Sequence, residues 1–364
     1  MRVFLAAALA LCLFPAVHAQ SDPKTAILET LGFDQLNAGQ TDQAISSLRQ
    51  AVSADPGNAA LHMGLGVAAY IQQRDADAER ELERAIALNS SLDQAHEFLG
   101  LVLHHQGDLH GAIRAYADWL AGKPPSDGTA RAADTLERWQ HELELRDRMD
   151  QTLSEHFTVS FEGPAVAELA QSAVDSLERA YARIGSLLST YPTSAVPVML
   201  YTTEQFQDVT RSPSWAAGSY DGVIRVPMRG ALDKPEELDR VLAHEYTHAL
   251  VHVLAPRAIP AWINEGLASA LESADTAWAD TIVASAPASI PLATLTSSFG
   301  RLNGPAATVA YAESALTMKA LLDDIGGAGV VNLIRDLGEG QSFDTAFAHR
   351  AQESFTTFSA RLGR

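Results

Sequence analysis

The chain has 364 residues, 47% of them hydrophobic, and a formal net charge of −19 at pH 7. This length and composition can bury two cores, so we expect about two domains. The acidic balance disfavours nucleic acid as a partner, because phosphate would be repelled and the sequence contains no run of basic residues to bind it.

Residues 1–19 have the pattern of a secretory signal. Arg2 precedes the apolar run VFLAAALALCLF, and a Val-His-Ala exit follows at residues 17–19. The apolar run is too short to span a bilayer and no later segment is longer, so we expect an exported protein, periplasmic or secreted, without a membrane span. The only cysteine, Cys12, lies inside this signal, so a metal site in the mature chain would rest on histidine and carboxylate.

Residues 20–126 contain three units with a period of 34 residues. The recurring positions hold glycine, alanine or a large side chain: Gly32, Gly66 and Gly100; Ala44, Ala78 and Ala112; Leu48, Leu82 and Tyr116. These units resemble tetratricopeptide repeats, in which small residues let two antiparallel helices approach and large ones fill the gap between them. The resemblance implies an all-α solenoid that recruits a protein partner or acts as a rigid spacer.

Residues 127–155 are polar and contain a helical pattern, which predicts a helix over about residues 131–153. We interpret this stretch as a cap on the repeats and a linker to the following domain. It contains no combination of side chains that would suggest chemistry.

From residue 156 the pattern changes to a mixture of strands and helices. The expected elements are a strand at 156–161, a helix at 165–188, a buried strand at 196–201, a strand at 219–228 and mostly helices at 307–361. The predicted fold class is therefore α+β, with an all-α repeat solenoid at residues 20–126 followed by a mixed domain at residues 156–364.

The segment VLAHEYTHALVHVL, residues 241–254, places two histidines on one face of a predicted helix. His244 and His248 are four residues apart, so both imidazoles can reach a single Zn²⁺. Glu245 lies beside them, where its carboxylate can act as the general base that takes a proton from water. The bare HExxH pattern is common by chance, so the prediction also needs a third ligand.

The segment PAWINEGLASALE, residues 260–272, supplies a candidate for that ligand. Its apolar residues recur at helical intervals, so Glu265 would project from a buried helix packed against the first one. A lone buried carboxylate is costly, and pairing with a metal removes this cost. We therefore predict that His244, His248 and Glu265 hold one zinc ion.

The two segments together resemble the gluzincin metallopeptidases of the peptidase MA type, in which a glutamate on the helix after HExxH is the third zinc ligand. The resemblance implies a zincin-like fold and a polypeptide substrate. It also implies that Glu272 orients a ligand histidine and that Tyr311 stabilises the oxyanion. The alternatives for these two residues are a solvated glutamate and a core aromatic residue.

The predicted function is an exported zinc metallopeptidase whose repeats recruit a substrate or partner. Aminopeptidase members of the superfamily hold the substrate's N-terminus with a Met-Glu-Asn segment, which this chain lacks. Main-chain pairing along residues 223–226 would be indifferent to chain ends, so we expect internal cleavage. The alternative function is a cell-envelope assembly or scaffold protein with a weakly active or inactive peptidase domain.

Overall fold

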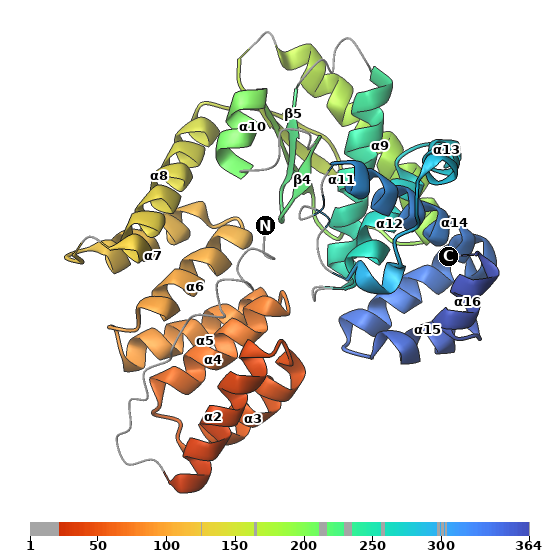
Figure 1. Ribbon diagram of the computed structural model, residues 1–364. Helices are drawn as coiled ribbons and strands as arrows, with labels where there is room; N and C mark the ends of the chain where they lie inside the picture. Colours follow the sequence, from red (N-terminus) through yellow and green to blue (C-terminus); the bar gives the residue numbers. More distant parts are fainter. Residues whose placement is uncertain are drawn as a thin grey trace. The chain divides into compact units, whose positions relative to one another are not determined.

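The structure is a computed structural model that describes residues 22–124, 126–163, 166–210, 217–228, 235–255, 259–296, 299, 302 and 304–363. The predicted signal at residues 1–19 lies outside the described residues. The chain divides into two compact units, Met1–Leu143 and Glu144–Arg364, which are drawn in Figure 1. Within the described ranges, every helix is too short or too polar to cross a membrane.

The first unit is a stack of antiparallel helix pairs (Figure 1). The pairs are α2 (Pro23–Asn37) with α3 (Thr41–Ala54), α4 (Ala59–Ile71) with α5 (Asp75–Leu88), and α6 (Asp93–His105) with α7 (Leu109–Leu120). Side chains satisfy the free backbone groups where two of these helices begin: Asn58 Oδ1 accepts from the Ala60 amide at 3.0 Å, and Asp108 Oδ1 accepts from the Gly111 amide at 2.8 Å.

The repeating glycines lie where the two helices of a pair come closest. A β-carbon on Gly32 would lie 2.6 Å from Leu48 Cγ, and one on Gly66 would lie 2.6 Å from Leu82 Cγ. Gly100 has the same relation to the ring of Tyr116. The 34-residue period in the sequence therefore arises from one close contact, between a glycine of the first helix and a large side chain of the second, that recurs in each helix pair.

Helix α8 (Asp127–Asp147) is shorter at its C-terminal end than expected, and the prediction of a helix as far as residue 153 is wrong. Residues Asp150–Leu153 form strand β1 instead, which pairs antiparallel with β2 (Phe157–Phe161). Strand β1 lies at the edge of its sheet and its side chains are mostly exposed. Its polar sequence therefore lacks the alternation by which a half-buried strand is recognised.

The second unit contains a five-stranded sheet with the order β1-β2-β3-β5-β4. Strand β3 (Val196–Tyr201) lies parallel to both β2 and β5 (Ile224–Pro227), and β4 (Ser219–Tyr220) pairs antiparallel with β5. The expected single strand at residues 219–228 is thus a hairpin that turns at Gly222, whose φ is 103°. The expectation that residues 223–226 form a free edge is wrong, because β3 and β4 flank β5.

The sheet is covered on both faces. One face packs with α9 (Ala167–Leu188) and α11 (Pro235–Leu254) in the largest hydrophobic core. The other face, which includes Met199 and Tyr201, packs with α10 (Thr203–Thr210) and with Leu145 at the end of α8. Helix α10 was not expected from the sequence.

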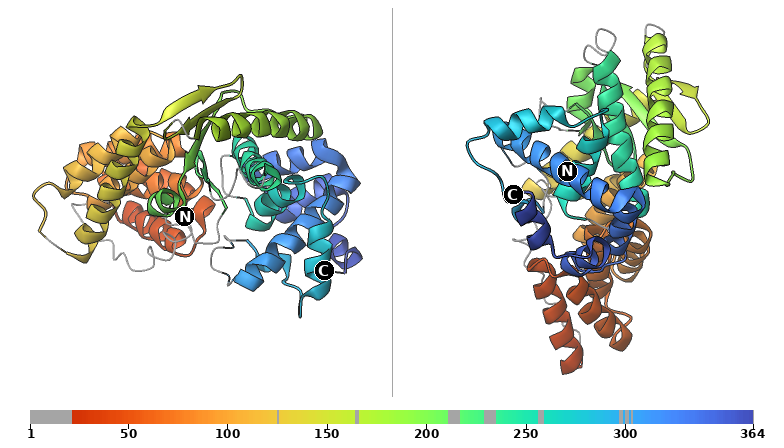
Figure 2. Two further views of the ribbon diagram at one scale, coloured as in Figure 1. Left: turned by 90° about the horizontal axis from the view of Figure 1, so that it is seen from above. Right: turned by 90° about the vertical axis from the view of Figure 1, so that its right-hand side faces the viewer.

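The C-terminal part of this unit is helical, as predicted. It comprises α12 (Ala261–Leu271), α13 (Ala277–Ser285), the 3₁₀ turn η3 (Leu292–Thr294), α14 (Gly304–Gly338), α15 (Phe343–Ala351) and α16 (Phe355–Arg361). Helix α14 is kinked at Gly326, where φ is 70°. Figures 1 and 2 show α14, α15 and α16 gathered beside α12.

Candidate metal centre

Helices α11, α12 and α14 carry the candidate site. Helix α12 begins after Pro260, and its first two amides donate to carbonyls of the two residues that follow η3: Ala261 to Thr296 at 3.2 Å and Trp262 to Leu295 at 3.0 Å. A β-carbon on Gly266 would lie 2.6 Å from the Ser314 carbonyl oxygen, so α12 and α14 are in close contact next to Glu265. These contacts fix the position from which Glu265 projects.

The three predicted ligands come together. His244, His248 and Glu265 each offer one ligand atom, and these atoms lie within 4.8 Å of one another. Nε2 of His244 is 3.6 Å and Nε2 of His248 is 3.5 Å from Oε2 of Glu265. All three side chains are largely buried, so their positions are set by the packing of α11 against α12.

Each histidine is oriented through its other ring nitrogen. Nδ1 of His244 lies 2.8 Å from Oε2 of Glu272, and Nδ1 of His248 lies 3.0 Å from Oδ1 of Asn264. A carboxylate can only accept, so Nδ1 of His244 carries the proton, and the amide oxygen of Asn264 has the same effect on His248. Both Nε2 atoms are thereby directed at Glu265, and in the neutral tautomer that binds a metal it is Nε2 that lacks the proton.

Glu272 therefore lies against the candidate ligand His244 and is not a solvated glutamate. It is 7% exposed, and its second oxygen, Oε1, accepts from Arg240 Nη1 at 2.9 Å. Asn264 was missed by sequence reasoning. Its only signal was its place directly before Glu265, which does not by itself say what its side chain contacts.

The charges of the site complement one another in the metal-free state. Burial alone would lower the pKa of His244, but the carboxylates of Glu265 and Glu272 outweigh it and raise this pKa to about 10. Burial alone would also lower the pKa of His248, but the carboxylate of Glu265 outweighs burial and raises this pKa. The two histidines in turn hold the pKa of Glu265 far below its usual range against the effect of burial. A divalent cation at this place would replace the protons held by the histidines.

Glu245 and Tyr311 both lie at this cluster. Glu245 is 5% exposed, and burial raises its pKa. The ring of Tyr311 is 6.3 Å from that of His244 and packs edge-on against Phe299 at 5.0 Å. Burial, followed by the charge of Glu265, raises the pKa of Tyr311 well above its usual value, so its hydroxyl remains a hydrogen-bond donor.

His252, one turn beyond His248 on α11, does not join the ligand cluster among the described residues. It is half-buried and packs edge-on against Tyr220 of β4, with ring centroids 5.8 Å apart. His252 is therefore a packed histidine.

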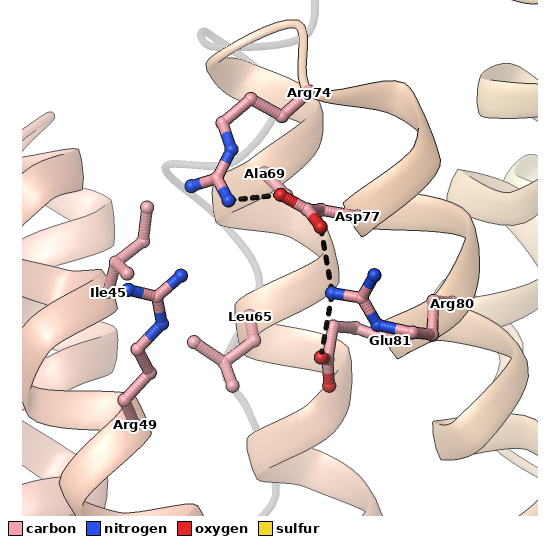
Figure 3. A pocket seen from close by; sticks show the side chains of 8 residues that line it. All are labelled: Ile45, Arg49, Leu65, Ala69, Arg74, Asp77, Arg80 and Glu81. Carbon is pink, nitrogen blue, oxygen red and sulfur yellow. Dashed lines mark hydrogen bonds and ion pairs between the residues drawn. The ribbon is translucent and has the colours of Figure 1, made fainter. Parts of the chain in front are cut away.

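The repeat unit contains a small pocket between α3 and α5, above α4 (Figure 3). Its lining residues are apolar or charged: Ile45, Arg49, Leu65, Ala69, Arg74, Asp77, Arg80 and Glu81. Asp77 accepts hydrogen bonds from Arg74 and, at 2.8 Å, from Arg80. These hydrogen bonds pair the carboxylate of Asp77 with two arginines of the pocket wall.

Comparison with known proteins identifies the repeats. The family model described as tetratricopeptide repeat matches residues 30–93 and 76–127. No curated protein matches the chain. Residues 30–127 therefore consist of tetratricopeptide repeats, as the period predicted. Repeats of this kind form extended surfaces for binding protein partners.

Several solved structures are similar to this part of the chain. The first TPR of Spaghetti (RPAP3) bound to HSP90 peptide SRMEEVD is 25% identical, with 34% of this chain and 99% of that chain covered and a TM-score of 0.32. MamA is 33% identical, with 35% and 72% covered and a TM-score of 0.32. The TPR domain of Sgt2 from Aspergillus fumigatus is 23% identical, with 37% and 88% covered and a TM-score of 0.33.

Proposed function

We propose that this protein is a zinc-dependent metallopeptidase that hydrolyses peptide bonds and uses its repeats to recruit a polypeptide substrate or a partner. The observation that carries the proposal is the convergence of His244, His248 and Glu265 within 4.8 Å. The hydrogen bonds that turn both Nε2 atoms toward Glu265 support it.

The donor set fits zinc. Two imidazole nitrogens and one carboxylate are a known ligand set of catalytic zinc sites, which leave one coordination position open. Magnesium and calcium prefer sites made of oxygen ligands. The chemistry of the residues therefore favours one Zn²⁺ per chain, held by these three side chains.

When bound, zinc acts as a Lewis acid that polarises the scissile carbonyl and makes a water molecule more acidic. Glu245 accepts the proton of the attacking water and returns it to the leaving amine. Tyr311 donates its hydroxyl hydrogen to the oxygen on which negative charge develops. Glu272 and Asn264 hold the two histidines in the orientation that this reaction requires.

We also propose that the substrate is cut internally. The sequence has no Met-Glu-Asn segment to bind a free amino terminus. The edge of the sheet beside the candidate site belongs to β4, so main-chain pairing with an extended substrate is assigned to Ser219 and Tyr220. An enzyme of this kind should cleave a blocked, internally quenched peptide and an unfolded protein. Efficient turnover of an amino-acid amide alone would contradict it.

The substitution Glu245→Gln tests the activity. An amide matches the carboxylate in shape but cannot act as the base, so the variant should keep its fold and zinc and lose hydrolysis by about 10²–10⁴-fold. Glu237→Gln is the matched control, because Glu237 lies on the same helix with its side chain 53% exposed. Turnover by Glu245→Gln close to that of the wild type would refute the proposed role.

A second function is favoured by the repeats themselves. A scaffold or assembly protein of the cell envelope would bind its partner through residues 30–127 and need little or no hydrolysis. Its biological role should then survive Glu245→Gln and fail when the repeats are removed. We further propose export to the periplasm or the medium on the pattern of residues 1–19, and a secreted chain that still begins at Met1 would contradict this.

A further inference from the structure

Gly218 lies directly against the candidate base. A β-carbon built on Gly218 would lie 2.6 Å from Oε1 of Glu245, 2.8 Å from its Cγ and 2.9 Å from its Cδ. Real β-carbons essentially never come within 3.0 Å of a heavy atom of a residue that is not next to them in the chain. The main chain just before β4 and the carboxylate of Glu245 are therefore in contact, and a β-carbon at position 218 would force the Glu245 side chain to move.

The second oxygen of Glu245 has a different environment. Oε2 is buried, and no described residue offers it a hydrogen bond. Most buried carboxylates are held by hydrogen bonds, but this one has no such bond at Oε2 to fix its orientation. On the Oε1 side, the Glu245 side chain packs against Gly218.

We propose that Gly218 is a positioning residue for Glu245: the main chain at this position holds the carboxylate in place by contact with Oε1. The proposal rests on the role proposed for Glu245. The residues that follow Gly218 are fixed, because Ser219 pairs with Arg225 and Tyr220 pairs with Ile224 in the hairpin. Glu245 itself projects from the buried helix α11. A side chain at position 218 would therefore displace the carboxylate, because the residues that follow position 218 are paired in the hairpin.

The consequence is a defect in the chemical step. Displacing a catalytic group by about 1 Å can lower the rate about 10²-fold. Gly218→Ala should lower kcat by about this factor and change KM little, and the variant should still hold one zinc per chain. Gly304→Ala is the matched control, because a β-carbon there would meet nothing within 4 Å.

The deciding experiment is a double-mutant cycle on stability, which needs no activity. Urea unfolding is measured for the wild type, Gly218→Ala, Glu245→Ala and the double variant. The urea midpoint should fall for Gly218→Ala in the wild-type background and should not fall in the Glu245→Ala background, where the carboxylate is gone. An equal loss in both backgrounds, failure to fold in both, or no loss in either would overturn the proposal. Hydrolysis by Glu245→Gln would instead refute the proposed function, so the two failures are distinguishable.

Discussion

The contact between Glu272 and His244 gives a quantitative prediction for Glu272→Gln. The carboxylate accepts from two buried donors, His244 Nδ1 at 2.8 Å and Arg240 Nη1 at 2.9 Å. A glutamine has one oxygen, so either the imidazole or the guanidinium must face its NH₂ group. A hydrogen bond with a charged partner contributes about 1.5–3 kcal/mol. That range corresponds to a loss in zinc affinity of about 10–100-fold, which is also the usual cost of removing an outer hydrogen bond to a ligand histidine.

Zinc affinity can be measured by competition with a chromophoric chelator at fixed pH. Glu237→Gln is the control, because Glu237 Oε1 accepts from Nη2 of the same Arg240 at 2.6 Å. Its side chain is 53% exposed, and no bond from it to His244 is seen among the described residues. The control should bind zinc like the wild type. An affinity of Glu272→Gln within twofold of the wild type, or an equal loss in the control, would refute the reasoning.

Three further predictions concern the oxyanion, the domain organisation and the repeats. Tyr311→Phe should retain zinc and lower kcat by about 10²–10³-fold, which is the usual effect of losing one hydrogen-bond donor to the oxyanion. An unchanged kcat in steady-state assays would mean that Tyr311 only packs in the core. A chain of residues 22–147 should be helical and melt cooperatively by circular dichroism, because each helix pair contacts mainly its neighbours; an unfolded product would mean that the two units share one core. Gly66→Ala should lower the free energy of unfolding by about 1–3 kcal/mol, because the new β-carbon would lie 2.6 Å from Leu82. Gly57→Ala is the control and should leave the free energy of unfolding unchanged, because the atom nearest to its new β-carbon would be 3.7 Å away. Equal urea midpoints for these two variants would contradict that account.

The repeats and the ligand helices could be predicted because each signal is local. A period of 34 residues reports a helix pair that repeats, and histidines four residues apart share a helix face wherever the helix lies. The position of Glu265 also followed, since Pro260 marks the start of a short amphipathic helix. These features depend on contacts within one element or between neighbouring ones.

The missed features depend on contacts that are distant in the sequence or on weak local patterns. Strand β1 is polar because it is an edge strand, so its sequence reads as the continuation of α8. The contact of Gly218 with Glu245 spans two strands and a helix, and no local pattern reports it. The same holds for the bond from His248 to Asn264.

Elemental analysis of the purified mature chain and two histidine variants tests the central claim most directly. The wild type and His252→Ala should each contain one zinc per chain, because His252 packs against Tyr220 and lies outside the ligand cluster. His248→Ala removes a ligand from the same helix and should lose the metal. One zinc per chain in His248→Ala, or none in the wild type, would contradict the account.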